Sequence, residues 1–152
     1  MALSRQDLTA LIDESMLFRS LSPEAREALV DIAQVHTFTL GDVLIEEGCR
    51  VEGLGLIVDG ALRVSTSSLP GQALELKILR GGAYFGEVGF LSRKPATATL
   101  AGEEAGTALI FPSEKLEALV VPFPQVKAVL ERLALRRAED TIEKTLKRLQ
   151  GE

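Results

Sequence analysis

The chain has 152 residues, of which 46% are hydrophobic and 26% charged, and its formal net charge is −5. This length supports one domain with a sizeable core, and the composition excludes a disordered chain. The negative charge argues against broad, sequence-independent nucleic-acid binding, which needs a basic surface to displace counterions from phosphates. Small molecules or other proteins are therefore the expected partners.

Single residues limit the chemistry further, because Cys49 is the only cysteine and His36 the only histidine. No intramolecular disulfide can form, and we expect no metal site of several Cys or His ligands and no cofactor. The amino-terminal residues lack the apolar stretch of a signal peptide, and no segment reaches the roughly 20 apolar residues of a membrane span. We therefore expect a cytoplasmic chain without a membrane partner.

The first third of the chain is predicted to be helical, with residues 1–16 as an N-terminal helical segment ahead of the main domain, residues 17–123. Ser22 followed by Pro23 predicts a helix start, because a serine hydroxyl can accept an orphan amide and proline lacks one. The apolar residues that follow recur at helical spacing and predict one buried face: Ala25, Ala28, Leu29, Ile32 and Ala33.

From about Val35 the pattern changes to short apolar runs separated by glycine, which predicts strands. Asp59-Gly60 predicts a tight hairpin turn, and residues 66–72 an exposed hairpin loop. Further strands are expected over residues 97–101 and 108–111. The predicted fold class is mainly β with flanking helices (α+β): an antiparallel β-roll, or double-stranded β-helix, with N-terminal helices and a long C-terminal helix.

Helical periodicity returns after Pro112, where Ser113 is a candidate N-cap, and Pro124 opens a last helix predicted for residues 124–152. An apolar stripe of this length either docks on the roll or pairs with its copy in a second chain. Because the chain ends at Glu152, soon after this helix, we expect no DNA-reading element in it. The stripe consists of Val126, Val129, Leu130, Leu133, Ile142, Leu146 and Leu149.

The segment with the clearest chemistry runs over residues 85–100. Gly86 and Gly89 would let the backbone approach a ligand closely, and a short helical turn starting near Gly86 would direct free amides at one point. Such a point attracts an anion. Glu87 lies in the same turn, where its carboxylate suits a sugar hydroxyl or a cation.

Two motifs in this order resemble the cyclic-nucleotide-binding domain shared by catabolite-activator-type regulators, protein-kinase regulatory subunits and cyclic-nucleotide-gated channels. Residues 44–60, with Gly55 inside an apolar run, are similar to the family's glycine-spaced pair of strands. Residues 85–90 match the start of its phosphate-binding cassette. The resemblance extends from about Leu17 to Leu133 and implies a small-molecule ligand, cAMP or cGMP. It also favours a homodimer formed through the C-terminal helix.

The resemblance assigns roles to individual residues. It implies that Glu87 accepts the ribose 2′-hydroxyl, that Thr97 lies beside the phosphate or the base, and that the amide of Ala98 adds a contact. A threonine at position 97 resembles guanine-preferring members. The residues implied to form the start of the phosphate cassette are Phe85, Gly86, Glu87, Val88 and Gly89.

One position departs from the family pattern, because Ala96 stands where an arginine normally pairs with the phosphate. A charge-assisted bond of this kind contributes about 1.5–3 kcal/mol, so binding should be roughly ten- to a hundredfold weaker. Arg93 and Lys94 lie just upstream and either supply the charge or form a solvated basic loop.

Three functional classes follow. The first is a regulatory ligand sensor, and the second is a degenerate, ligand-free roll that acts as a dimerisation or docking module. An enzyme is the least favoured, since the usual metal cluster and a Ser-His pair would both have to rely on His36.

Overall fold

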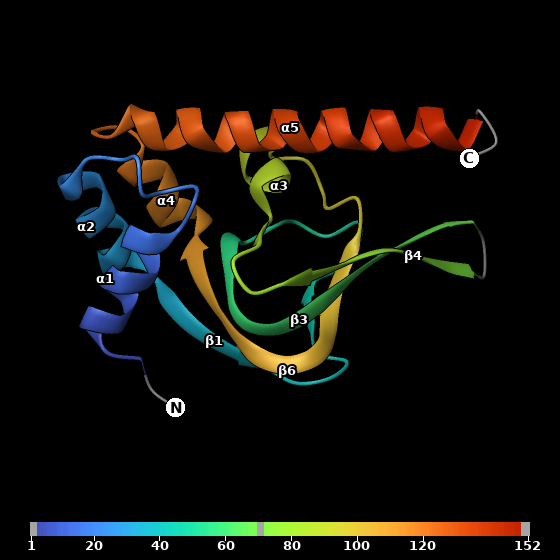
Figure 1. Ribbon diagram of the computed structural model, residues 1–152, viewed down its shortest axis with the longest axis horizontal. Coiled ribbons are helices and arrows are strands. Elements are labelled where there is room, and N and C mark those ends of the chain that lie inside the picture. The colour runs from blue at the N-terminus through green and yellow to red at the C-terminus, as the bar shows by residue number, and fades with distance from the viewer. Residues whose placement is uncertain (1–2, 70–71, 150–152) are drawn as a thin grey trace.

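The computed structural model describes the backbone of residues 3–69 and 72–149 and the side chains of residues 3–67 and 77–137. Antiparallel strands form a curved sheet, three helices cluster at one end of it, and a long helix runs straight along one side (Figure 1). The predicted α+β fold, a β-roll with N-terminal helices and a long C-terminal helix, is confirmed.

Two capped helices begin the chain, α1 (Arg5–Glu14) and α2 (Pro23–Ile32). The predicted start of α2 is confirmed, since Ser22 Oγ accepts from the amide of Ala25 at 3.2 Å and Pro23 occupies the first turn. Helix α1 begins with a capping box between Ser4 and Asp7, which satisfies two amides that have no partner inside the helix.

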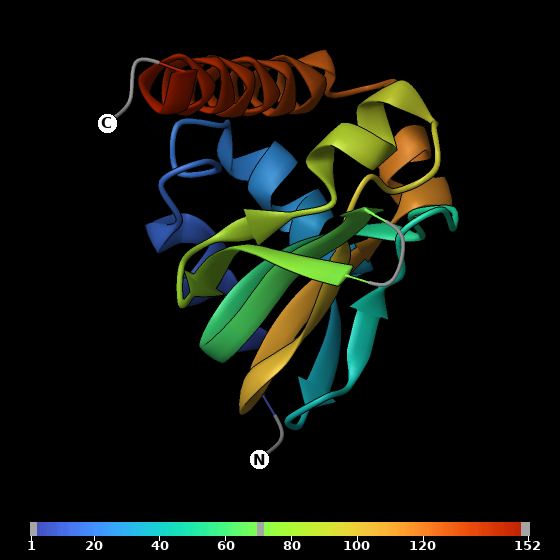
Figure 2. The same cartoon turned by 90° about the vertical axis from the view of Figure 1, so that its right-hand side faces the viewer.

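The sheet contains β1 (Gln34–Phe38), β2 (Val43–Ile45), β3 (Gly53–Leu69), β4 (Gln72–Arg80), β5 (Tyr84–Phe85) and β6 (Thr99–Pro112). Its order is β1-β6-β3-β4, with β2 paired to β6 and β5 paired to β3. All these pairings are antiparallel. The long central strands β3 and β6 curve together, and the β3–β4 end projects away from the helices (Figures 1 and 2).

The predicted hairpin at Asp59-Gly60 is wrong, because β3 continues through both residues. Its register against β6 shifts three times between Ile57 and Leu62, and Gly60 has a φ of +78°. The glycine therefore bends the strand without ending it. The strands expected at 97–101 and 108–111 are not separate, because residues 99–101 and 108–111 belong to one strand, β6, which begins two residues later than predicted. The expected loop at 66–72 is shortened by β3 and β4.

Two helices follow the sheet, α4 (Ser113–Leu119) and α5 (Pro124–Leu149). Pro124 opens the long helix as predicted. Ser113 is not the N-cap of α4 but its first residue, because its amide donates to Glu52 O at 2.9 Å and its hydroxyl lies 3.4 Å from Val51 O. The serine joins α4 to the segment before β3.

Buried apolar side chains form two clusters. One lies among the helices and one end of the sheet, and it includes Ile12 of α1 and Leu116 of α4. The other fills the roll and includes Phe38, Ile57 and Leu62. Helix α5 joins the first cluster through Val126, Val129 and Leu130, whereas the stripe residues Ile142, Leu146 and Leu149 lie outside the described side chains. None of the described helices combines the length and the apolar character needed to cross a membrane.

Candidate functional site

The predicted helical turn is present as α3 (Glu87–Ser92), which follows directly from β5. Gly86 precedes it with a φ of +84°, a conformation that only glycine adopts readily. The amides of Glu87, Val88 and Gly89 form the first turn, where a helix has no acceptors of its own. Helix α3 lies beneath α5 (Figure 1), in contact with it.

The two motifs of the sequence pack directly against each other. A Cβ on Gly89 would fall 2.2 Å from Val51 Cγ2, and one on Gly86 would fall 2.6 Å from Gly53 O. We expected these glycines to make room for a ligand. The structure shows that on this side they make room for the segment that precedes β3.

Glu87 is held by a residue from α5. Arg137 Nη1 lies 2.6 Å from Glu87 Oε1, and Arg137 Nη2 donates to the carbonyl of Tyr84 at 2.5 Å. The glutamate side chain is only 4% exposed. Its second oxygen, Oε2, is buried and has no hydrogen-bond partner among the described residues.

Arg137 was not among the site residues predicted from the sequence. Arg137 lies 50 residues from Glu87 in the chain. It belongs to a predicted helix in which the sequence pattern pointed to an apolar stripe and not to a site residue. Only the position of α5 over α3 brings the two residues together.

The segment after α3 places the other predicted site residues. Arg93, with a φ of 60°, pairs with Glu117 of α4 at 3.3 Å, so its charge is directed to that helix. Lys94 and Thr97 are exposed, and Ala98 packs against the apolar cluster inside the roll. Among the described ion pairs, Glu87 pairs with Arg137 and with neither Arg93 nor Lys94.

Ala96 is fixed through its backbone. Its amide donates to Cys49 O and its carbonyl accepts from the amide of Gly48, both at 2.8 Å. The turn that it contacts is itself secured, because the amide of Glu47 donates to Thr99 Oγ1 at 3.0 Å. Both backbone groups of Ala96 are therefore held by the turn at residues 48 and 49.

The carboxylate of Glu47 ties the same turn to the end of β3. It accepts from the amide and the hydroxyl of Ser67 at 2.9 and 2.8 Å and from Thr66 Oγ1 at 2.7 Å. The amide of Ser67, followed by the two hydroxyls, lowers the pKa of Glu47 below its ordinary value of 4.5.

Tyr84 connects β5 to the N-terminal helices. Its hydroxyl donates to Ser15 Oγ, and its ring packs edge-to-face on Phe18 with centroids 5.5 Å apart. Burial raises the pKa of the phenol above 10.0, and the bonds to Ser15 and Leu17 oppose this shift. Tyr84, which precedes the cassette, is therefore held through its side chain by Ser15 and through its carbonyl by Arg137.

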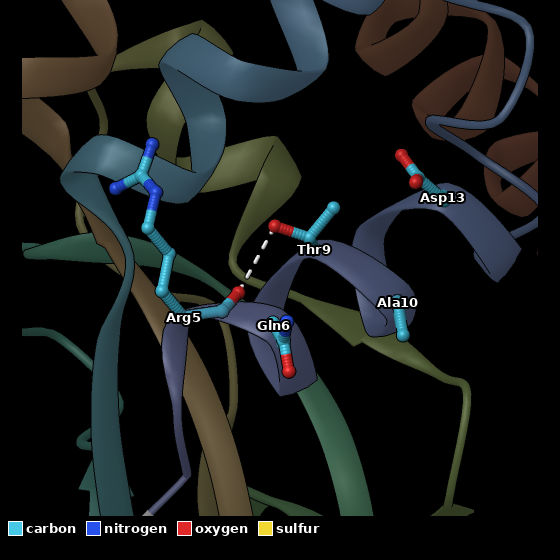
Figure 3. Close-up of a pocket in the computed structure, with 5 residues that line it drawn as sticks. All are labelled: Arg5, Gln6, Thr9, Ala10 and Asp13. Atoms are coloured by element: carbon cyan, nitrogen blue, oxygen red, sulfur yellow. Dashed lines mark hydrogen bonds between the residues drawn. The ribbon is translucent and has the colours of Figure 1, made fainter.

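Two cavities lie elsewhere, on α1 and α2. One, of about 430 Å³, is lined by Arg5, Gln6, Thr9, Ala10 and Asp13 along α1 (Figure 3). The other, of about 330 Å³, lies between the two helices and includes Arg26 and Val30. Neither is lined by a cassette residue. Within the described residues, no group of three or more His, Cys, Asp or Glu side chains could hold a metal ion.

The antiparallel roll, the flanking helices and the glycine-led turn with its buried carboxylate together define a β-roll domain with flanking helices. The sequence model of the cyclic nucleotide-binding domain matches residues 35–121. The chain belongs to this family, and the resemblance drawn from residues 44–60 and 85–90 is confirmed.

Relatives and solved structures agree with this assignment. The cAMP-dependent protein kinase regulatory subunit of Blastocladiella emersonii is 32% identical over 96 residues, which is 63% of this chain and 24% of that protein. The catabolite activator protein of Thermus thermophilus superposes with a TM-score of 0.77 at 27% identity, covering 88% of this chain and 62% of the other.

A third similarity concerns the fold alone. The regulatory subunit of a cAMP-independent protein kinase A from Trypanosoma brucei superposes with a TM-score of 0.79 at 20% identity, covering 93% of this chain and 51% of the other. The chain thus spans about a quarter of the Blastocladiella relative and between half and two thirds of these two structures.

Proposed function

We propose that this chain is a regulatory domain without catalytic activity that binds a cyclic nucleotide through residues 85–98. The observation that carries the proposal is Glu87, a buried carboxylate whose Oε2 lacks a partner at the start of α3. Leaving a buried acceptor unpaired costs about 1–3 kcal/mol, and a sugar hydroxyl would remove that cost.

The cyclic phosphate would bind at the first turn of α3, where the amides of Glu87, Val88 and Gly89 lack helical acceptors. Phe85 supports this turn from the interior of the roll. Thr97 would lie beside the phosphate or base, and the amide of Ala98 would add a contact. Arg93 and Lys94 remain peripheral in this proposal, because Arg93 is paired with Glu117.

Binding is proposed to be weak because Ala96 supplies no charge to the phosphate. Curated relatives include cAMP-dependent regulatory subunits and a cGMP-dependent protein kinase, so both nucleotides are candidates. Isothermal titration with cAMP and cGMP up to millimolar concentration tests the proposal, with Glu87→Gln as the site control. The expected result is measurable heat that the control variant reduces. No heat from either nucleotide would exclude the sensor.

The alternative is a ligand-free roll that acts as a dimerisation or docking module. Two observations favour it: Ala96 replaces the phosphate-pairing arginine, and Glu87 Oε1 is already occupied by Arg137. A similar fold occurs in a regulatory subunit described as cAMP-independent, so the fold does not by itself determine the ligand. Binding by Ala96→Arg, but not by the wild-type chain, would favour this alternative.

Self-association through α5 is a separate proposal. Val126, Val129 and Leu130 are buried in the core, so a truncation before α5 would damage the fold. The stripe residues farther along, Ile142 and Leu146, are the better targets. If they pair two chains, changing both to Glu should convert a dimer to a monomer in sedimentation at equal concentration. An unchanged mass would remove α5 as the interface.

A cytoplasmic location also remains a proposal. Cys49 is free and exposed, which suits a reducing compartment.

A further inference from the structure

The turn at residues 46–49 holds both ends of the segment 97–98, which is proposed to contact the ligand. Before this segment, Ala96 makes two backbone hydrogen bonds with the turn, both at 2.8 Å. After it, Thr99 Oγ1 accepts from the amide of Glu47 in the turn at 3.0 Å. A displacement of the turn would therefore move residues 97–98 from both sides.

The connection between α3 and β6, residues 93–98, is neither helix nor strand. It therefore lacks the repeating backbone bonds that stabilise such elements, and single contacts with neighbouring segments carry more weight. The bonds to the turn are contacts of this kind, so the direction of the Ala98 amide depends on where the turn is held.

Glu47 fastens the turn to the end of β3. Its carboxylate accepts from Thr66 Oγ1 at 2.7 Å and from the amide and the hydroxyl of Ser67 at 2.9 and 2.8 Å. Bonds to an ionised acceptor are stronger than bonds between neutral groups. The amide of Ser67, followed by the two hydroxyls, lowers the pKa of Glu47, so the carboxylate is ionised and accepts all three bonds at neutral pH.

We propose that Glu47 is a positioning residue for the ligand site, which holds the turn at residues 46–49 and, through it, the segment 97–98. The inference rests on the proposed function, because it needs this segment to contact a ligand. Glu47 itself does not contact the ligand in this proposal. It makes the ligand site depend on the end of β3, which is remote from the cassette in the sequence.

The test combines variants on both sides of the turn. Glu47→Gln removes the carboxylate charge and one acceptor, and Thr99→Val removes the hydroxyl that accepts from the Glu47 amide. Thr99→Ser keeps this hydroxyl, and Glu46→Gln, an exposed neighbour in the same turn, is the matched control. Each variant is made in the wild-type full-length chain and in an Ala96→Arg chain, where affinity should be higher. Calorimetric titration with cAMP and cGMP gives the affinities.

Hydrogen exchange supplies a second measurement that needs no ligand. The amides of Gly48 and Ala96 donate the two backbone bonds that join the turn to the loop, so their exchange reports the opening of this contact. The amide of Leu109 is the reference for opening of the whole fold, because this residue is buried in β6 between β1 and β3.

Glu47→Gln should weaken nucleotide binding roughly three- to tenfold at neutral pH. Exchange at Gly48 and Ala96 should become about tenfold faster or more, while exchange at Leu109 changes much less. Thr99→Val should give the same pattern, whereas Thr99→Ser should match the wild type. The control variant should also match the wild type.

Other results would overturn the inference in separate ways. Faster exchange in Glu47→Gln with unchanged affinity would show a purely structural role and leave the proposed function intact. Equal weakening by Glu46→Gln would show that the net charge, and not the bonds of Glu47, affects binding. If Glu47→Gln does not fold, the double variant Thr66→Val/Ser67→Ala, which removes two of the donors, carries the comparison with the same expected results. Absence of binding to both the wild-type and the Ala96→Arg chains would overturn the inference together with the proposed function.

Discussion

Gly55 on β3 lies directly against the ring of Phe85 on β5, so that a Cβ on Gly55 would fall 2.0 Å from Phe85 Cζ. The pair joins the two sequence motifs of the family and closes the interior of the roll behind the cassette. The absence of a side chain at position 55 is therefore a packing requirement.

Gly55→Ala should destabilise the fold by about 1–3 kcal/mol, because the added methyl overpacks a filled interior. Phe85→Leu in the same chain should recover part of this loss, since the ring is the obstacle. Urea unfolding of the two single variants and the double variant measures the coupling. A Gly55→Ala chain as stable as the wild type would contradict the contact.

Ala96→Arg should raise the affinity for cyclic nucleotide roughly ten- to a hundredfold, by restoring a charge-assisted bond to the phosphate. The backbone at this position is held by Cys49 and Gly48, so the loop should keep its shape. Calorimetric titration measures the change. Ala96→Gln, which adds length without charge, is the control, and an equal gain in that variant would rule out the electrostatic explanation.

Tyr84 is the only tyrosine and the chain has no tryptophan, so tyrosinate absorbance reports this residue alone. Its pKa is raised above 10.0 by burial. The folded chain should therefore titrate at higher pH than the chain unfolded in urea. The corresponding stability is present below pH 10.0 and is lost as the pH rises through the folded pKa.

Tyr84→Phe should remove this alkaline loss of stability while weakening the fold slightly at neutral pH, because the bond to Ser15 is gone. Equal titration midpoints in the folded and unfolded chains would show that the phenol is not desolvated.

Glu47 should make the fold sensitive to acid. Because its folded pKa is lowered, the stabilisation is present above the ordinary value of 4.5 and is lost as the pH falls through the folded pKa. Glu47→Gln should flatten the dependence of the unfolding free energy on pH in that acid range. Urea midpoints measured from neutral pH downward test this, with the exposed neighbour Glu46→Gln as the control. An identical acid slope in Glu47→Gln and the wild type would count against the network.

Much of this protein follows from local patterns in its sequence. The Ser22-Pro23 start of α2, the opening of α5 at Pro124 and the helical turn after Gly86 were all predicted correctly. Helix capping and the fixed backbone angle of proline depend on a few neighbouring residues, so helix starts can be predicted from the local sequence. The order and spacing of two glycine motifs likewise identified the family.

Local patterns failed where distant segments determine the structure. Gly60 has the positive φ of a turn residue, but β3 continues to pair with β6 beyond it, so the glycine bends the strand. Ser113 is the first residue of α4, and its amide donates to the carbonyl of Glu52 in the segment before β3. The pairing of Arg137 with Glu87 depends on how α5 lies over α3. Sequence periodicity tells which side of a helix is buried, but only the folded chain decides which charge meets which partner.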